Sequence, residues 1–364
     1  MLEPTYRIIQ ASATQVLPTF ATGCMDCIVT SPPYWGQRFY GEEANQWWGG
    51  EADCAHDCDA NMTCQRCGGW HGQLGLEPHP ALYLEHLWEI FDECWRVLRD
   101  TGTLWVNLGD TYYGGDTTRS DALSRRNRNH ESKVSGRKRD LKGLDEWCRP
   151  KQLLLVPSHF AIGMCERGWI LRNDIAWLKG NPRPEPVGDR FIPSYEHVFL
   201  FVKQRRYYLD LDAVRVPKRS VGDGDALGLG NNPGDVWRVD TRAFRGAHYA
   251  VFPPDLPRTI IRAGVPQRAC MACGRPYRTV WQPFRVEVRE GSEQLNIETD
   301  WLRGCRCDAP TRPGMVLDPF CGSGTTLMVA KEEGRSAVGI EPIQENVEMA
   351  RGRLEDARRV VKAL

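Results

Sequence analysis

The sequence predicts an α/β fold, in which helices cover both faces of a twisted, mostly parallel sheet. Two observations at opposite ends of the chain predict it. Near the C-terminus, an apolar stretch at residues 314–317 leads through a glycine-rich turn into a helical segment and then a second apolar stretch at 336–340, which is the order of a βαβ unit. Near the N-terminus, the apolar residues 27–30 run into two prolines, which end a strand and expose the next residues at its carboxyl edge.

The elements predicted up to residue 108 are two strands, a helix and a third strand. Residues 6–10 form the first predicted strand, ahead of 27–30. Residues 82–98 are predicted as a helix because apolar side chains recur there at helical spacing. These apolar positions are Leu84, Leu87, Trp88, Phe91, Trp95 and Leu98. The pair Thr101-Gly102 then turns the chain into a predicted strand at residues 103–108.

The C-terminal half supplies the remaining elements. Strands are predicted at residues 169–178 and 196–203, and the second of these is almost continuously apolar, as in a strand buried on both faces. The terminal βαβ unit comprises a strand at 314–317, a helix at 325–333, a strand at 336–340 and a helix from about Gln344.

Composition excludes some classes of protein. A chain of 364 residues can hold one large α/β domain with insertions, or two domains. Lys plus Arg and Asp plus Glu both number 47, so a nucleic-acid surface must come from local clustering of charge. No apolar run reaches the roughly 18 residues of a membrane span, and the N-terminus lacks a signal-peptide pattern. We therefore expect a soluble, cytoplasmic protein with no membrane partner.

The turn after residues 314–317 is a candidate ligand site. It reads Asp318-Pro319-Phe320-Cys321-Gly322-Ser323-Gly324-Thr325-Thr326. Gly322 and Gly324 permit unusual backbone angles and close approach of a ligand. Glu341 ends the next strand, 23 residues after Asp318, where it can accept hydrogen bonds from ribose hydroxyls, while Asp318 can meet an ammonium group. The six-position glycine pattern of dinucleotide sites is absent, so S-adenosylmethionine fits better than a dinucleotide or a turn without a ligand.

The sequence Ser31-Pro32-Pro33-Tyr34 is a candidate catalytic turn. An exocyclic amino nitrogen is a poor nucleophile because its lone pair is delocalised into the ring, so it needs acceptors that hold both amino hydrogens. The Ser31 hydroxyl and the Pro32 carbonyl can supply two, on a backbone that the prolines fix. Tyr34 can stack on a base that has left the duplex, with Trp35 extending the apolar wall. An ordinary Pro-Pro loop is the alternative, and the presence of the glycine turn in the same chain disfavours it.

Together, these two strings resemble the DNA amino-methyltransferases. Because the catalytic turn precedes the cofactor turn, the chain resembles their circularly permuted beta class, which implies a Rossmann-like methyltransferase fold. The resemblance covers roughly two thirds of the chain. It includes the segments up to Leu108, Trp177-Leu178-Lys179, the strand around Glu196-His197, and His248-Tyr249-Ala250-Val251-Phe252-Pro253.

The resemblance implies roles for particular residues. The catalytic residues would be Ser31, Pro32, Pro33 and Tyr34, and the contacts to S-adenosylmethionine would be Asp318, Phe320, Gly322, Ser323, Gly324, Thr325, Glu341 and Phe252. Ser in the first position of the catalytic turn is commoner in N4-cytosine enzymes, and Asp in N6-adenine enzymes, so N4 of cytosine is the preferred target. Carbon-5 chemistry is rejected because Cys24 and Cys27 lack the Pro-Cys setting that it uses. Where the family tends to carry Gly-Asp, the chain has Gln10-Ala11-Ser12, so no acid is assigned there.

Fourteen cysteines in a chain with no sign of export point to metal instead of disulfides. Two sets have short spacings that suit structural zinc, which takes four ligands and leaves no open position. The first is Cys54, Cys58, Cys64 and Cys67, for which His56 or His71 could substitute, and the second is Cys270, Cys273, Cys305 and Cys307. Met271 to Tyr277 would form a knuckle and residues 279–288 a strand of a ribbon. Free cysteines remain the alternative for each set.

These features predict a catalytic domain that is interrupted by two insertions. Residues 1–35, 81–265 and 313–364 would form the catalytic domain, with zinc-binding insertions at 36–80 (a four-cysteine site) and 266–312 (ribbon-like). Residues 205–245 are a candidate target-recognition region. Residues 119–142 hold nine Lys or Arg against three acidic residues and could lie along phosphates, although a solvated loop is the plain alternative.

The sequence therefore predicts a site-specific methyltransferase of double-stranded DNA, which could be partnered with a separate restriction endonuclease in a bacterial, archaeal or phage setting. An N6-adenine enzyme is a close alternative. A zinc-containing DNA-binding module with an inactive methyltransferase core is the alternative from another class, and the intact Ser31-Pro32-Pro33-Tyr34 turn disfavours it.

Overall fold

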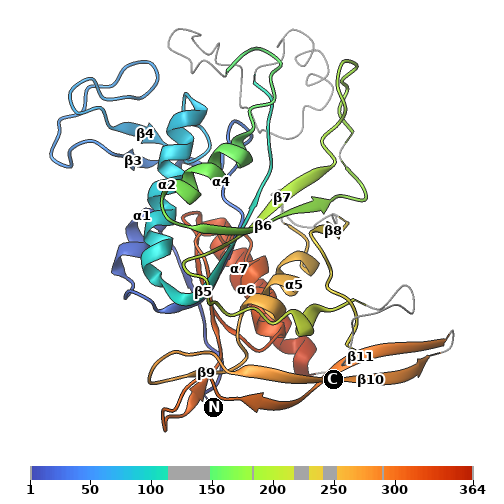
Figure 1. Ribbon diagram of the computed structural model, residues 1–364. Helices are drawn as coiled ribbons and strands as arrows, with labels where there is room; N and C mark the ends of the chain where they lie inside the picture. Colours follow the sequence, from blue (N-terminus) through green and yellow to red (C-terminus); the bar gives the residue numbers. More distant parts are fainter. Residues whose placement is uncertain are drawn as a thin grey trace. The chain divides into compact units, whose positions relative to one another are not determined.

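The computed structural model describes residues 2–113, 148–182, 184–216, 229–240, 252–288 and 291–362. An eight-stranded sheet dominates it, with the strand order β1-β14-β13-β2-β5-β7-β6-β8. Figure 1 labels β5, β6, β7 and β8 of this sheet. The strands of this sheet are β1 (Tyr6–Ile9), β2 (Met25–Thr30), β5 (Leu98–Leu108), β6 (Ile170–Leu178), β7 (Tyr195–Val202), β8 (Val236–Arg238), β13 (Met315–Asp318) and β14 (Ser336–Ile340).

Most of the sheet is parallel. Parallel pairs join β1 to β14, β14 to β13, β13 to β2, β2 to β5, and β6 to β8. The pair β6 and β7 is antiparallel. The predicted α/β fold with a mostly parallel sheet is confirmed.

The described residues also form helices, 3-10 turns and three two-stranded sheets outside the main sheet. The helices are α1 (Ala13–Val16), α2 (Pro80–Val97), α4 (Val156–Glu166), α5 (Asp255–Gly264), α6 (Thr325–Glu332) and α7 (Gln344–Lys362), with 3-10 turns η1 (Leu17–Thr19), η2 (Glu42–Ala44) and η3 (Leu211–Val214). The small antiparallel pairs are β3 (Gln46–Trp48) with β4 (Trp70–Gly72), β9 (Ala269–Cys270) with β12 (Thr311–Arg312), and β10 (Arg278–Val288) with β11 (Gly291–Leu302).

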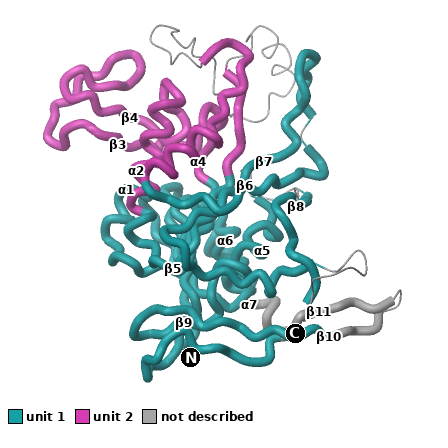
Figure 2. The backbone as a smooth tube through the Cα atoms, in the orientation of Figure 1, with its two compact units in different colours: residues 1–31, 94–107, 168–364 teal, residues 32–93, 108–167 magenta. Residues whose placement is uncertain are grey.

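Two compact units divide the chain (Figure 2). Unit 1 comprises residues 1–31, 94–107 and 168–364, and unit 2 comprises 32–93 and 108–167. The predicted domains followed composition and kept 36–80 and 266–312 as insertions. The second cysteine set belongs to unit 1, and the first shares unit 2 with residues 108–167.

The core of unit 1 lies along the sheet. Val198, Leu200 and Val202 of β7 pack in one buried cluster with Ile260 and Ile261 of α5. This burial explains the nearly continuous apolar run of β7, because a central strand faces packed side chains on both sides.

A buried carboxylate joins the starting ends of β2 and β13. Asp26 is 4% exposed and accepts hydrogen bonds from Arg312 Nη1 at 2.6 Å and from the Met315 backbone N–H at 2.7 Å. The charge is therefore paired in place, and its contacts help to align β13 beside β2.

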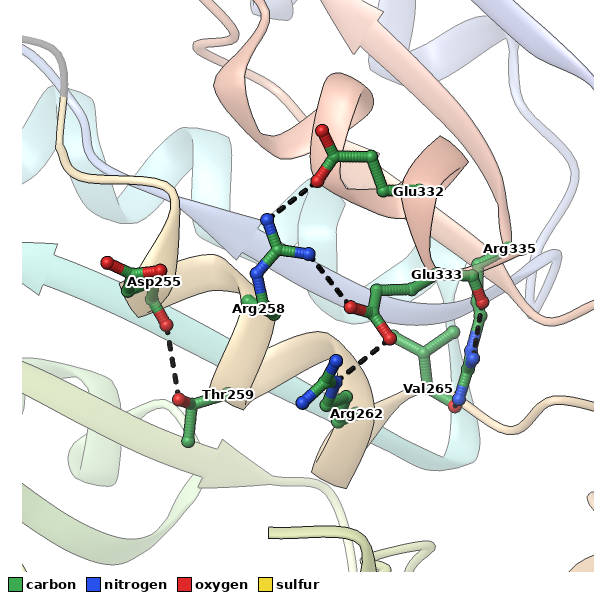
Figure 3. A network of polar contacts seen from close by, with 8 residues as sticks. All are labelled: Asp255, Arg258, Thr259, Arg262, Val265, Glu332, Glu333 and Arg335. Atoms are coloured by element: carbon green, nitrogen blue, oxygen red, sulfur yellow. Dashed lines mark hydrogen bonds and ion pairs between the residues drawn. The ribbon is translucent and has the colours of Figure 1, made fainter. Parts of the chain in front are cut away.

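Helix α5, which sequence patterning does not predict, is attached to the end of α6 by an ionic network (Figure 3). Arg258 contacts Glu332 at 2.6 Å and Glu333 at 2.9 Å, and Arg262 contacts Glu333 at 2.9 Å. The guanidinium of Arg335 donates to the Val265 carbonyl just after α5. The network thereby fixes the segment that begins at Phe252 relative to the helix after the glycine turn.

Among the described helices, none combines the length and the apolar composition that a membrane crossing requires.

Candidate functional site

The site forms where two neighbouring parallel strands end. Strand β13 pairs with β2 through Val316 opposite Cys27 and Leu317 opposite Ile28. The strand order reverses here, because β13 is followed in sequence by β14 on one side, whereas β2 leads to β5 on the other. In open α/β sheets, ligands bind outside the carboxyl ends of the strands at such a switch point. The Thr30 hydroxyl donates to Asp318 Oδ1 at 2.7 Å, so the two strand ends are in contact.

Glycine is needed at two positions of the turn after β13, for a different physical reason at each. Gly322 and Gly324 have φ of +49° and +78°, in the left-handed region that favours glycine. A Cβ on Gly324 would lie 2.7 Å from the Cβ of Ala350, so this glycine allows α7 to pack against the turn. A Cβ on Gly322 would meet nothing within 4 Å. The backbone at Gly322 therefore borders open space that a ligand can approach.

Asp318 is buried at the centre of this arrangement. It is 1% exposed and accepts hydrogen bonds from Thr30, from the Phe320 backbone N–H at 3.1 Å and from the Thr326 hydroxyl at 2.6 Å. Burial raises the pKa of Asp318 to about 6, although these hydrogen bonds oppose the shift. A carboxylate offers about four lone-pair positions, so three donors leave it able to accept one more.

Glu341, just after β14, has a similar arrangement. It is 6% exposed and accepts hydrogen bonds from the Gly322 backbone N–H at 2.9 Å, from the Ile343 backbone N–H at 3.1 Å and from Asn346 Nδ2 at 3.0 Å. Burial raises its pKa. Glu341 therefore holds the glycine turn in shape and retains capacity for a further donor, as does Asp318.

Two predicted cofactor contacts have their side chains engaged elsewhere. Arg353 of α7 donates to Ser323 Oγ at 2.7 Å and to Thr325 Oγ1 at 2.9 Å. These two hydroxyls therefore accept from Arg353 and keep their hydrogens as donors. Phe252 is half-buried against the core cluster of unit 1, and Phe320 is half-buried in the turn.

Ser31 follows β2 directly and is half-buried. Its hydroxyl donates to Asn107 Oδ1 at 3.3 Å, near the end of β5. Asn107 in turn donates through Nδ2 to Glu196 Oε2 at 3.0 Å and to the His197 carbonyl at 3.1 Å. Sequence reasoning missed Asn107, which sits within an apolar strand pattern, although the resemblance had singled out Glu196 and His197.

The rest of the predicted catalytic turn lies in unit 2. The Pro33 carbonyl accepts from Tyr83 Oη at 2.7 Å, and the Gly36 N–H donates to the Gly75 carbonyl at 2.7 Å. No hydrogen bond to the Pro32 carbonyl is found within the described residues, and Pro32 is buried. Tyr34 is half-buried.

Trp35 does not extend an apolar wall beside Tyr34, because it is only 2% exposed and belongs to the core of unit 2. Its indole N–H donates to the Glu77 carbonyl at 3.0 Å. The Glu77 carboxylate accepts from His86 Nδ1 at 2.9 Å and from the Gly75 N–H at 2.8 Å. Burial raises the pKa of Glu77 although His86 opposes the shift. This buried pair braces the residues that follow the predicted catalytic turn, and no spacing in the sequence indicates it.

The first cysteine set gathers with one change of ligand. Ligand atoms of Cys54, His56, Cys64 and Cys67 all lie within 4.8 Å of one another. Cys58 is not among them, so the predicted group of four cysteines becomes a group of three cysteines and one histidine. Cys54 Sγ and Cys64 Sγ are 3.8 Å apart. Tetrahedral zinc with Zn–S of about 2.3 Å separates its sulfurs by roughly 3.8 Å, so the donor set fits zinc.

The second cysteine set gathers as predicted. Ligand atoms of Cys270, Cys273, Cys305 and Cys307 also lie within 4.8 Å of one another. Strands β9 and β12 and the hairpin β10–β11 bring together its two pairs, which are far apart in sequence. Four thiolates of this kind fit a closed, structural zinc site.

Burial also bears on the rejected carbon-5 chemistry, which needs a reactive thiolate. Burial raises the pKa of Cys27 to about 12 and that of Cys321 well above the ordinary thiol value. Neither is a nucleophile at neutral pH.

The basic segment 119–142 lies outside the described residues, as do 217–228 and 241–245 of the candidate recognition region and residues 248–251.

Comparison with known protein families gives a match over most of the chain. The family model described as DNA methylase, N6_N4_Mtase, matches residues 25–272 and 308–352. A type II methyltransferase of Citrobacter freundii, M.Cfr9I, is 34% identical over 350 residues, covering 96% of this chain and 87% of the relative. A type II methyltransferase of Serratia marcescens, M.SmaI, is 31% identical over 349 residues, covering 96% and 90%.

Solved structures share the fold. The PvuII DNA methyltransferase, named as cytosine-N4-specific, gives a TM-score of 0.55 at 16% identity, with 98% of this chain and 93% of that chain covered. A DNA modification methylase of Thermus thermophilus, solved with S-adenosyl-L-methionine, gives 0.51 at 18% identity, with 97% and 96% covered.

Proposed function

The chain belongs to the family of N6 and N4 DNA methylases, and on that premise we propose that it methylates an exocyclic amino group in duplex DNA. The methyl donor is S-adenosylmethionine, and the target is a flipped base, N4 of cytosine in preference to N6 of adenine. The observation that carries this proposal is the contact between the two strand ends, Thr30 with Asp318 at 2.7 Å. Thr30 directly precedes Ser31 and Pro32, which we propose as acceptors for the amino group. Its contact therefore brings these residues close to Asp318, the carboxylate that we propose for S-adenosylmethionine.

The residues at the end of β13 fit S-adenosylmethionine. Gly322 borders open space, and the buried carboxylates of Asp318 and Glu341 each have capacity for one more donor. We assign Asp318 to the methionine ammonium and Glu341 to the ribose hydroxyls, with Phe252 as an apolar contact. When bound, S-adenosylmethionine would supply the methyl group: its sulfonium would become a neutral thioether as the base nitrogen takes the carbon, and the released amino proton would pass to solvent.

The residues at the end of β2 prepare the amino group. The Ser31 hydroxyl oxygen and the neighbouring Pro32 carbonyl accept its two hydrogens, which draws the nitrogen lone pair out of the ring. The two prolines keep this backbone in place, so little reorganises during the reaction. One such preorganised contact is worth roughly 3 kcal/mol in the transition state. Tyr34 stacks on the base, because a base still paired in the duplex cannot offer its amino group.

Cytosine is the preferred base because Ser occupies the first position of the catalytic turn. The PvuII enzyme, which shares the fold, carries cytosine-N4 specificity in its name. The partners are double-stranded DNA and, as for a type II methyltransferase, a separate restriction endonuclease within the same cell. Residues 119–142 and 205–245 are proposed to contact the DNA.

We also assign a structural zinc ion to each ligand group, three cysteines with one histidine in unit 2 and four cysteines in unit 1. Both have four protein ligands, so neither leaves a position for a reacting water. The first holds together a segment of low apolar content.

Methyl transfer to duplex DNA, followed by digestion to nucleosides and mass spectrometry, tests the proposal. We expect N4-methyldeoxycytidine with the unmodified protein and a rate lower by about 10²- to 10³-fold with Ser31→Ala. N6-methyldeoxyadenosine as the sole product would overturn the choice of base. If the unmodified protein binds no S-adenosylmethionine in calorimetry, with Asp318→Ala as the reference, the chain is a DNA-binding module with an inactive core.

A further inference from the structure

We propose that Asn107 is a positioning residue that makes the Ser31 hydroxyl an acceptor toward the base. The inference rests on the proposed function and adds to it the device that sets the direction of a catalytic hydrogen bond. A serine hydroxyl can donate or accept, whereas the exocyclic amino group that it must hold presents hydrogens. The direction of the Ser31 hydroxyl therefore decides whether it holds the amino group or repels it.

Two acceptors fix the orientation of the Asn107 amide. Its NH2 group donates to the Glu196 carboxylate at 3.0 Å and to the His197 carbonyl at 3.1 Å. A carbonyl can only accept, as can an ionised carboxylate, so the NH2 group must face them and the amide oxygen must face the other way. Asn107 is 5% exposed, which leaves little room for an alternative rotamer.

The amide oxygen of Asn107 then fixes Ser31. It lies 3.3 Å from Ser31 Oγ and cannot donate, so the Ser31 hydrogen points to it. What the Ser31 oxygen offers to any further partner is acceptor capacity. This is the direction that the amino hydrogens of a base require.

A lysine completes the series of contacts. Lys179, just after β6, forms an ion pair with Glu196 through Oε1, while Oε2 accepts from Asn107. The series Lys179, Glu196, Asn107 and Ser31 therefore crosses from β6 through β7 and β5 to the end of β2, all within unit 1. It gives a physical reason for Lys179 and Glu196, which the proposed function leaves without a role.

A double-mutant cycle of Ser31→Ala and Asn107→Ala tests the proposal, using single-turnover methyl transfer. We expect Asn107→Ala to lower the rate by about tenfold or more, with the dissociation constants of S-adenosylmethionine and DNA unchanged. The double variant should transfer no more slowly than Ser31→Ala alone, because Asn107 acts only through that hydroxyl. Effects that multiply in the double variant would overturn the proposal.

Glu196→Gln provides a second test if Asn107→Ala does not fold. A glutamine at 196 can donate as well as accept, so it weakens the hold on the Asn107 amide and leaves the His197 carbonyl as the only partner that must accept. We expect the rate to fall severalfold, and to be insensitive to this change once Ser31 is alanine. Asp174→Asn is the matched control, because Asp174 forms another carboxylate contact between β6 and β7, at 2.8 Å to His197, without touching Asn107. Equal effects of Glu196→Gln and Asp174→Asn would contradict the proposal.

Failure of this inference can be told apart from failure of the proposed function. An unmodified protein that transfers no methyl group overturns the function. The orientation of Asn107 is still decided by side-chain amide hydrogen exchange, measured by nuclear magnetic resonance. We expect slow exchange for the Asn107 NH2 group, accelerated by Glu196→Gln and unchanged by Ser31→Ala. Rapid exchange in the unmodified protein would contradict the fixed amide.

Discussion

At the scale of single residues, Asp318 joins the ends of two strands and is the residue that we propose to bind the donor ammonium. Hydroxyls from Thr30 and Thr326 and a backbone N–H satisfy it from three directions, yet burial raises its pKa to about 6. A carboxyl with a raised pKa in the folded state favours folding at low pH, and that contribution is lost as the pH rises from about 4 to 6. A cationic ligand that pairs with the carboxylate would reverse this penalty.

This residue predicts a pH dependence of cofactor binding. The affinity for S-adenosylmethionine should be level above pH 6 and fall by about tenfold per pH unit below it, because the ammonium needs the ionised form of Asp318. Asp318→Asn should bind more weakly at pH 7.5 and lose most of this slope. Calorimetry between pH 5 and 8 measures both. A profile that slopes equally in the variant would exclude Asp318 as the titrating group.

The first cysteine group makes a prediction about ligand identity. In protein loaded with cobalt, His56→Ala should lose one metal ion per chain, because His56 is in the group. Cys58→Ser should keep both ions, because Cys58 is not. Metal content and the cobalt absorption spectrum, which differs between sites with three and with four thiolates, provide the measurement. Loss of metal in Cys58→Ser with retention in His56→Ala would restore the ligand set that the cysteine spacing predicts.

The roles of residues can be predicted where a short, contiguous motif contains all of the groups involved. The string from Asp318 to Thr326 indicates a turn with its glycines, and the second cysteine set comes together as its spacing predicts. The exchange of Cys58 for His56 depends on how residues 54–67 fold, which spacing does not encode. Likewise, only the packing of α7 shows that Ser323 and Thr325 face Arg353.

At the scale of elements, α5 and α6 illustrate a contact that sequence periodicity does not reveal. Strongly patterned elements were predicted well: β14 is found at Ser336–Ile340, and α6 begins at Thr325 as expected. Helix α5 was missed because it has only ten residues, with a proline and two arginines among them. Those arginines become intelligible only when Glu332 and Glu333 of the α6 end lie opposite them.

The ionic network predicts an uneven effect of two neighbouring glutamates on stability. Glu333→Gln should lower the free energy of unfolding by about 1–2 kcal/mol, because Glu333 is paired with two arginines in a largely buried place. Glu332→Gln is the control, because it loses only a single, more exposed ion pair with Arg258. It should lower the free energy of unfolding by less. Urea unfolding at pH 7.5 measures the difference. An equal or larger effect of Glu332→Gln would show that the pairing of Glu333 with two arginines is not what stabilises this contact.

The same pair predicts a pH dependence. Burial acts to raise the pKa of Glu333, but Arg262 and Arg258 outweigh it and hold the pKa below the usual range. A lowered carboxyl pKa stabilises the fold above the unfolded value of about 4.5, and this contribution is lost as the pH falls through the folded value. The gap in unfolding free energy between the unmodified protein and Glu333→Gln should therefore shrink in acid.

At the scale of the whole molecule, residues 288 positions apart in the sequence meet through one hydrogen bond, Thr30 with Asp318. Parallel strands carry their carboxyl ends to the same edge of a sheet, so two neighbouring strands of this kind bring Thr30 and Asp318 together. The sheet order that makes β2 and β13 neighbours comes from tertiary pairing. Nor could the sequence reveal that residues 32–93 and 108–167 form one compact unit, since no composition boundary marks it.

A crystal structure of the protein with S-adenosylmethionine would show directly whether the ends of β2 and β13 build one site. We predict that the ammonium contacts Asp318, the ribose contacts Glu341, and the donor methyl group faces the Ser31 hydroxyl. A donor bound elsewhere on the chain, or one whose methyl group points away from Ser31, would contradict this prediction.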